Sequence, residues 1–153
     1  MSRSIALDEY LPHAPAQVWR ALTEPELLAR WLMPPTDFQL KVGHRFTFQG
    51  TPVPRVQFSG IVRCEVLSFE VERSLCYSWV DHSGENDLRS IVTWRLEPEG
   101  QGTHLFLVHD GFDPEHPLQQ LSYQIMSGGW GRLMRQLVEL FAAEDAMPTS
   151  PGQ

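Results

Sequence analysis

The chain has 153 residues, of which 42% are hydrophobic and 10% aromatic, and its formal net charge is −7. This length predicts one domain that buries roughly 70% of its extended surface. Its basic residues are scattered, so neither nucleic acid nor an anionic membrane surface is an expected partner, since both need clustered Lys and Arg. The first residues do not resemble a signal peptide, and no apolar run reaches the roughly 20 residues that span a bilayer. We therefore expect a cytoplasmic protein.

The chain begins with a predicted strand and two short helices. Residues 3–11 alternate between apolar and other side chains, which is typical of a strand. Glu9 shares the apolar face, as a solvated charge near the strand end or as an acid that points inward. A first helix is expected to begin at Pro15, because proline is favoured at the first helical position. Thr23 and Glu26 have the spacing of a capping box, which predicts a second helix that stops at the following proline pair.

Period-two alternation then predicts six further strands. They cover residues 38–42, 46–48, 56–71, 75–79, 88–96 and 103–112. Turn-forming residues predict loops at residues 43–44, 50–54, 81–87 and 97–102. The apolar phase changes between Val66 and Leu67, and Gly60 interrupts the same strand. A bulge or bend is therefore expected at the phase change, and a bend or a close approach of backbone at the glycine.

Residues 117–144 predict a long amphipathic helix, because apolar residues recur at steps of three or four. This apolar stripe comprises Leu118, Leu121, Ile125, Gly129, Leu133, Leu137, Leu140 and Phe141. Each of the glycines at 128, 129 and 131 costs roughly 1 kcal/mol relative to alanine inside a helix. Because Gly129 lies on the stripe itself, we expect the middle of the helix, straight or kinked, to face something that needs room. Strands followed by one covering helix indicate an α+β fold with an antiparallel sheet.

Several motifs along the chain resemble those of one known family. They are Val18-Trp19-x-Ala21-Leu22-Thr23-x-Pro25-x-Leu27-Leu28-x-x-Trp31, Gly43-x-x-Phe46, Gly60-x-Val62, Tyr77-x-Trp79, Thr93-Trp94-x-Leu96-x-Pro98, Gly102-Thr103-x-Leu105-x-Leu107-x-His109-x-Gly111-Phe112 and Gly129-Trp130-x-x-Leu133. This pattern resembles the START-like (Bet-v-1-like, SRPBCC) superfamily, in particular its activator of HSP-90 ATPase homologue-like family. The resemblance implies a helix-grip fold, in which a curved seven-stranded antiparallel sheet wraps around the carboxy-terminal helix and leaves a cavity between them. It implies a single START-like domain, which we place over residues 3–145. The composition of the last residues predicts a disordered tail at 146–153.

The spacing of residues along the chain gives little indication of a catalytic site or a metal site. The histidines and cysteines lack the spacings of metal sites, so neither a metal nor another cofactor is expected, and Cys64 and Cys76 are expected to be reduced thiols. His109 shares the predicted inward face of its strand. It could orient a ligand or act as an acid or base. We favour the alternative, a buried neutral histidine bonded to backbone or to a carboxylate, for which Glu9 is a candidate.

Large aromatic side chains near glycines suit a pocket of several hundred cubic ångströms. The candidate ligand-binding residues are Trp19, Trp31, Phe46, Phe58, Tyr77, Trp79, Trp94, His109, Ile125, Gly129 and Trp130. The leading hypothesis is a binder of a small apolar molecule. One alternative is an enzyme like the polyketide cyclases and dehydratases, using His109 with Glu9 or Tyr77. Another is a protein-interaction module of the HSP-90 ATPase activator type, although no residue pattern supports a chaperone partner. A homodimer through exposed strands or the short helices is compatible with the sequence.

Overall fold

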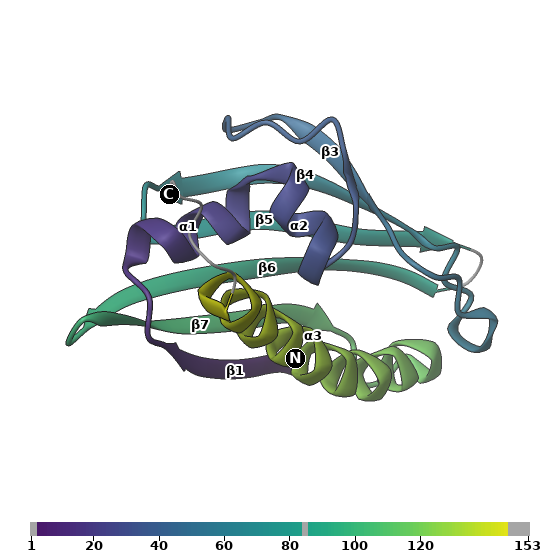
Figure 1. Cartoon of the computed structure of the whole chain (residues 1–153). Coiled ribbons are helices and arrows are strands. Elements are labelled where there is room, and N and C mark those ends of the chain that lie inside the picture. Colours follow the sequence, from purple (N-terminus) through teal and green to yellow (C-terminus); the bar gives the residue numbers. More distant parts are fainter. Residues whose placement is uncertain (1–2, 84–85, 147–153) are drawn as a thin grey trace.

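The computed structural model describes residues 3–83 and 86–146, and in these two stretches the chain forms one seven-stranded sheet and three α-helices (Figure 1). The elements in chain order are β1 (Arg3–Leu11), α1 (Pro15–Thr23), α2 (Pro25–Trp31), β2 (Pro35–Thr36), β3 (Arg45–Gln49), the 3-10 helix η1 (Pro54–Val56), β4 (Ile61–Glu70), β5 (Ser74–Ser83), β6 (Asn86–Glu99), β7 (Gly102–Phe112) and α3 (Pro117–Ala146). All strand pairs are antiparallel, and the strand order is β1-β7-β6-β5-β4-β3-β2.

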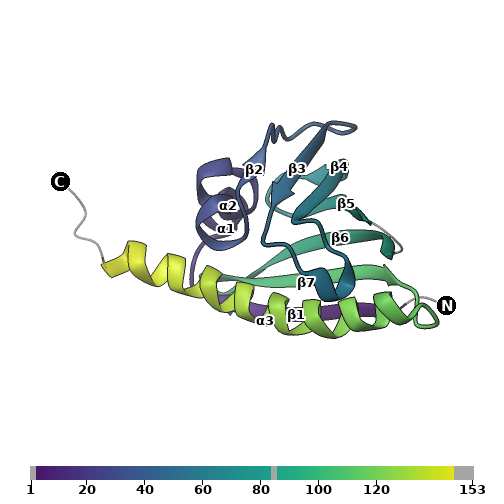
Figure 2. The same ribbon diagram turned by 90° about the vertical axis from the view of Figure 1, so that its right-hand side faces the viewer.

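The three α-helices lie on one face of a curved sheet (Figure 1). Helix α3 runs beside β1 and β7, while the sheet rises from that edge towards β3 and β4 (Figure 2). Helix α3 is contacted by the 3-10 helix η1 and also by α2. The predicted α+β helix-grip fold is therefore confirmed, including the two short helices after the first strand.

The helix α2 begins where expected but not for the expected reason. The hydroxyl of Thr23 donates to the carbonyl oxygen of Trp19 at 2.8 Å, and the N-cap is Glu24, which makes no side-chain capping bond. The predicted capping box is therefore wrong, because the threonine side chain folds back onto α1. The pair of helices is joined instead by Trp31, whose Nε1 donates to the carbonyl oxygen of Ala21 at 2.8 Å.

The strand predicted over residues 38–42 is absent from the described sheet. The two-residue strand β2 ends before Asp37, which adopts a left-handed conformation with φ of 62°. That conformation interrupts an extended chain, so the alternation that follows does not form a ladder. Phe38 and Leu40 still pack against the hydrophobic core from this loop. Val42, by contrast, is exposed. The prediction of a strand is therefore wrong, and the alternation correctly indicated partial burial for Phe38 and Leu40 alone.

The next strand also begins later than predicted. Val56 ends η1, and Gln57 is left-handed with φ of 58°, so β4 starts only at Ile61. Gly60 has φ of 95°, and a Cβ there would lie 3.0 Å from the carbonyl oxygen of Gly50. The amide of Gly50 also donates to the Gly60 carbonyl. The expected close backbone approach at Gly60 is confirmed, although it lies before the strand rather than within it.

The predicted bulge in β4 is confirmed. Val66 pairs with Tyr77, but Ser68 pairs with Cys76, so Leu67 is the extra residue. Val66 is buried, and Leu67 is 39% exposed. The change of apolar phase in the sequence therefore marks the point at which the side chains of β4 exchange faces.

Two loops are shorter than predicted, because antiparallel pairing continues to Ser83 opposite Asn86 and to Glu99 opposite Gly102. The faces of β7 are as predicted. His109, like the leucines two and four residues before it, is completely buried, whereas Val108 is exposed. Both cysteines are free thiols on strands, Cys64 on β4 and Cys76 on β5.

Helix α3 extends to Ala146, two residues beyond the predicted end. The sheet-facing positions in its first half are not those of the predicted stripe. The most buried residues of α3 are Gln119, Ser122, Trp130, Met134, Leu137, Leu140 and Phe141. Ile125 and Gly129 are only half-buried, because the middle of the helix faces a cavity rather than packed core. Of the predicted tail, residues 147–153 lie outside the described part of the chain. No helix in the described part is long and apolar enough to cross a membrane.

Candidate ligand-binding cavity

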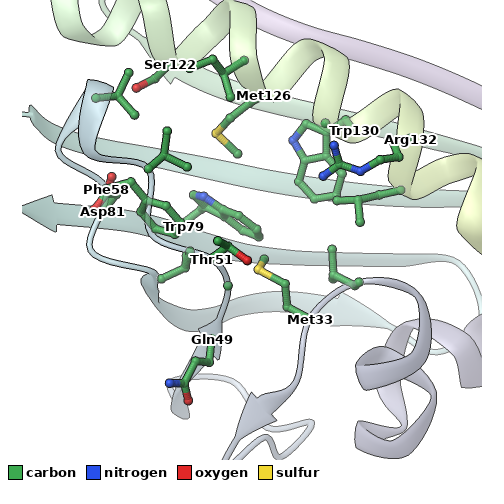
Figure 3. A pocket seen from close by; sticks show the side chains of 18 of the residues that line it. Met33, Gln49, Thr51, Phe58, Trp79, Asp81, Ser122, Met126, Trp130 and Arg132 are labelled. Carbon is green, nitrogen blue, oxygen red and sulfur yellow. The ribbon is translucent and has the colours of Figure 1, made fainter.

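A cavity of about 530 Å³ lies between the sheet and α3, is bordered by residues of α2 and of the segment around η1, and opens to solvent (Figure 3). Its volume falls in the range of roughly 300–1,000 Å³ that is usual for small-molecule sites. The lining residues are Ala29, Leu32, Met33, Pro34, Gln49, Gly50, Thr51, Val53, Val56, Phe58, Val62, Trp79, Asp81, Leu88, Ser122, Ile125, Met126, Gly129, Trp130, Arg132, Leu133 and Gln136.

Apolar side chains form most of the wall, and they come from both layers of the fold. The sheet contributes Trp79 and Leu88, and α3 contributes Met126 and Trp130. The two indoles are in contact, with ring centroids 5.4 Å apart. On the same wall, a Cβ added at Gly129 would meet no atom within 4 Å. The glycine therefore leaves open space in the middle of a helix, at a position where a larger side chain would extend into the cavity.

The polar residues of the wall fall into an exposed group and a buried pair. Gln49, Thr51, Arg132 and Gln136 are exposed, as is normal at the mouth of a pocket. Asp81 and Ser122 are each only 4% exposed. Figure 3 shows this pair on one side of the cavity and Arg132 on the opposite side. The cavity is thus apolar in the middle and polar at both ends.

Behind the wall, His109 joins four elements through hydrogen bonds. Nε1 of Trp130 donates to Nδ1 of His109 at 2.9 Å, and the Ser90 hydroxyl donates to the carbonyl oxygen of Trp79 at 2.7 Å. Since that hydroxyl proton is used, Nε2 of His109 must donate to Ser90 Oγ, 2.7 Å away. Both ring nitrogens are therefore occupied in a neutral imidazole. Burial lowers the pKa of His109 to about 3, which agrees with this neutral form.

The prediction of a buried, neutral His109 is confirmed, but the predicted carboxylate partner is wrong. In the pairing of β1 with β7, Ile5 lies opposite His109, and Glu9 lies opposite Leu105. The carboxylate is thus displaced along the strand and is not among the hydrogen-bond partners of the imidazole. Ser90 was the available signal in the sequence, because it is a lone polar residue on the buried face of β6.

The structure divides the candidate ligand contacts into two groups. Those in the cavity wall are Phe58, Trp79, Ile125, Gly129 and Trp130. Those in packed core outside the wall are Trp19, Trp31, Phe46, Tyr77, Trp94 and His109. In this core, Nε1 of Trp94 donates to the hydroxyl of Tyr77 at 3.0 Å, and Nε1 of Trp31 donates to the carbonyl oxygen of Ala21.

Sequence reasoning missed several wall residues, of which Asp81 is the most informative. Asp81 continues the inward-facing alternation of Tyr77 and Trp79, but the polar residues after it suggested a loop. The strand β5 instead runs through to Ser83, so the carboxylate lies inside. The methionines at 33 and 126 were also missed, because flexible apolar residues give no distinct signal of a cavity.

The side chains considered for catalysis do not line the cavity. Burial raises the pKa of the Tyr77 hydroxyl, which accepts the hydrogen bond from Trp94. Glu9 is half-buried on β1 and does not line the cavity. Among the described residues, no three His, Cys, Asp or Glu side chains come together as metal ligands would.

Comparison with known proteins identifies the family. The family described as "Activator of Hsp90 ATPase homolog 1-like protein" matches residues 12–142. The crystal structure of protein MLL2253 from Mesorhizobium loti is similar at 36% identity, with 92% of this chain and 98% of that chain covered and a TM-score of 0.81. CalU16 from Micromonospora echinospora is similar at 29% identity, with 89% and 74% covered and a TM-score of 0.70.

Protein NE0264 from Nitrosomonas europaea has the same fold at 23% identity, with 94% of this chain and 97% of that chain covered and a TM-score of 0.70. The search of curated proteins found no match. The match to the family covers most of the chain, and the described residues have its helix-grip architecture. The chain therefore belongs to the activator of Hsp90 ATPase homolog 1-like family.

Proposed function

We propose that the protein binds a small apolar ligand in the cavity between the sheet and α3. The observation that carries the proposal is a cavity of about 530 Å³ that is lined by Trp79 on the sheet and Trp130 on the helix and adjoins the open space at Gly129. Large aromatic walls with a few polar groups at the ends are typical of ligand pockets.

Energetics supports a binding function over an accidental packing defect. A glycine in a helix interior costs roughly 1 kcal/mol relative to alanine. An apolar cavity also lacks the van der Waals contacts that close packing would supply. A simple leucine or methionine at position 129 would recover both contributions, so the open space is costly to stability. A ligand that fills the space would restore the missing contacts.

The positions of His109 and Tyr77 favour binding over the cyclase-like alternative. A general acid or base must come within hydrogen-bond reach of the substrate. Both side chains instead lie behind the wall with their polar atoms engaged. The family name does not assign an activity, since one fold can host many functions. Binding is therefore the function that the geometry supports best.

The proposal is tested by titrating the protein with the solvatochromic dye Nile red and comparing two leucine variants. Gly129→Leu adds a side chain at the cavity wall, whereas Gly128→Leu makes the same change at an exposed position of the same helix, where a Cβ also meets no neighbour. We expect Gly129→Leu to weaken dye binding about tenfold or more, as a filled site would. Gly128→Leu should bind like wild type. Equal binding by both variants, or no binding by wild type, would refute the proposed site.

A further inference from the structure

Asp81 is the one buried ionisable side chain among the described residues that line the cavity. The other ionisable lining residue, Arg132, is exposed. Asp81 is two residues after Trp79 on β5, so both side chains project from the same face of the strand. Ser122 brings a second buried polar side chain to the same side of the cavity (Figure 3). One end of a mostly apolar cavity therefore has a buried carboxyl group.

A carboxylate in such surroundings is a strong acceptor. Burial removes much of the water that would screen it, and the low local dielectric strengthens the hydrogen bonds that it makes. A charged donor forms a shorter and stronger bond to a carboxylate than a neutral donor does. The same burial disfavours an anion, because like charges repel and little water separates them. Position and burial together make this end of the cavity selective for the charge of a ligand.

The geometry points to a ligand class: an amphipathic amine, whose apolar, ring-containing body lies in the cavity against Trp79 and Trp130 and whose ammonium group donates to Asp81. This inference rests on the proposed function and adds to it the chemistry of the ligand. The two indoles are in contact, with centroids 5.4 Å apart, and together they form an apolar part of the wall for the body.

The test uses four probes that share a naphthalene ring and differ in one terminal group. They are 2-(2-naphthyl)ethylamine, 2-(2-naphthyl)ethanol, 2-ethylnaphthalene and the carboxylate anion 2-naphthaleneacetate. Their binding is measured by isothermal titration calorimetry. A hydrogen bond to a charged group predicts that wild type prefers the amine over 2-ethylnaphthalene by about tenfold or more. The alcohol should fall between these two, and the acetate should bind most weakly.

Two variants separate a local carboxylate from the acidic character of the whole chain. Asp81→Asn keeps the shape and removes the charge, so the preference for the amine should fall to about threefold or less. Glu139→Gln removes the same charge from an exposed position of α3 outside the cavity and should keep the wild-type preference. If Asp81→Asn does not fold, the order of the four probes on wild type still decides.

The outcomes separate the two proposals. If 2-ethylnaphthalene binds as tightly as the amine, or if Asp81→Asn retains the preference, the cavity still binds apolar molecules but the assignment of an amine to Asp81 is overturned. If none of the four probes binds, both the amine assignment and the proposed function are overturned. An amine preference that is lost in Asp81→Asn and kept in Glu139→Gln supports both.

Discussion

Nε1 of Trp130 donates a hydrogen bond to Nδ1 of His109 at 2.9 Å, so a residue that lines the cavity is held by a residue buried in the sheet. The two rings meet edge to face, with centroids 5.9 Å apart and planes at 82°. Through Ser90 the same histidine is joined to the backbone of Trp79, which also lines the cavity. His109 thus positions the two indoles against which we expect the ligand to lie.

Replacing His109 with Phe should destabilise the protein although the volume is nearly kept. The change leaves the indole N–H of Trp130 buried without an acceptor, which costs about 1–3 kcal/mol. Urea denaturation measures this loss for His109→Phe, for Trp130→Phe and for the double variant. We expect the double variant to be less destabilised than the sum of the single variants, with a coupling of about 0.5–3 kcal/mol. Strictly additive losses would mean that the hydrogen bond contributes nothing to stability.

The free energy of unfolding should depend on pH through His109. In the unfolded chain the imidazole takes up a proton near its ordinary pKa of 6.5, whereas burial keeps it neutral in the folded chain down to about pH 3. Between these values the unfolded state binds more protons, so this contribution to stability is complete above the higher value and is lost as the pH falls. The slope that it adds is at most about 1.4 kcal/mol per pH unit.

This pH contribution is isolated by subtracting the unfolding profile of His109→Phe from that of wild type. The contributions of titrating groups that the two proteins share cancel in this difference. The difference should shrink as the pH is lowered from 6.5 towards 3. Parallel profiles across that window would contradict the assignment of a neutral, buried imidazole.

Alanine should have opposite effects at two glycines. Gly111 has φ of 119°, and a Cβ there would approach the carbonyl oxygen of Arg89 and the Cα of Ser90 to 3.0 Å. Gly111→Ala should therefore cost about 1–3 kcal/mol, as strained backbone positions do. Gly128 is exposed in α3 and meets no neighbour, so Gly128→Ala should stabilise by up to about 1 kcal/mol. Denaturation midpoints that shift in the same direction would refute this pair of predictions.

The two thiols should differ in reactivity. Burial raises the pKa of the Cys64 thiol, so little of the reactive thiolate is present at neutral pH. Cys76 is only half-buried. Under native conditions, iodoacetamide should modify Cys76 well before Cys64, as peptide mapping by mass spectrometry would show. In denaturant both should react at similar rates. Equal native rates would mean that Cys64 is reached by solvent more easily than its burial indicates.

The glycines of α3 allowed one feature of the cavity to be predicted from the sequence. The glycines of α3 correctly indicated that the helix faces open space, since nothing else accounts for Gly129 on an apolar stripe. Because a Cβ at position 129 would meet no neighbour within 4 Å, we expect Gly129→Leu to fill the cavity without overpacking.

Local patterns in the sequence were sufficient to predict the order of the elements, the inward face of β7 and the bulge at Leu67. Each of these depends on side-chain periods of two or 3.6, which a few neighbouring residues define. Periodicity failed at residues 38–42, where the left-handed Asp37 ends the strand, although Phe38 and Leu40 are still partly buried against the core. The period of apolar residues in a sequence indicates which side chains tend to avoid water. It does not indicate whether the backbone pairs with another strand.

Only the tertiary structure decided which buried residues surround the cavity. Trp79 and Trp94 have the same local signal, yet one lines the cavity and the other is enclosed by core. Likewise, the partners of His109 come from β6 and α3, far from it in the chain. Hydrophobic burial has no direction, so the sequence by itself determined which side chains leave water. Whether each then meets another side chain or an open space depends on how distant segments pack, and no local pattern encodes that.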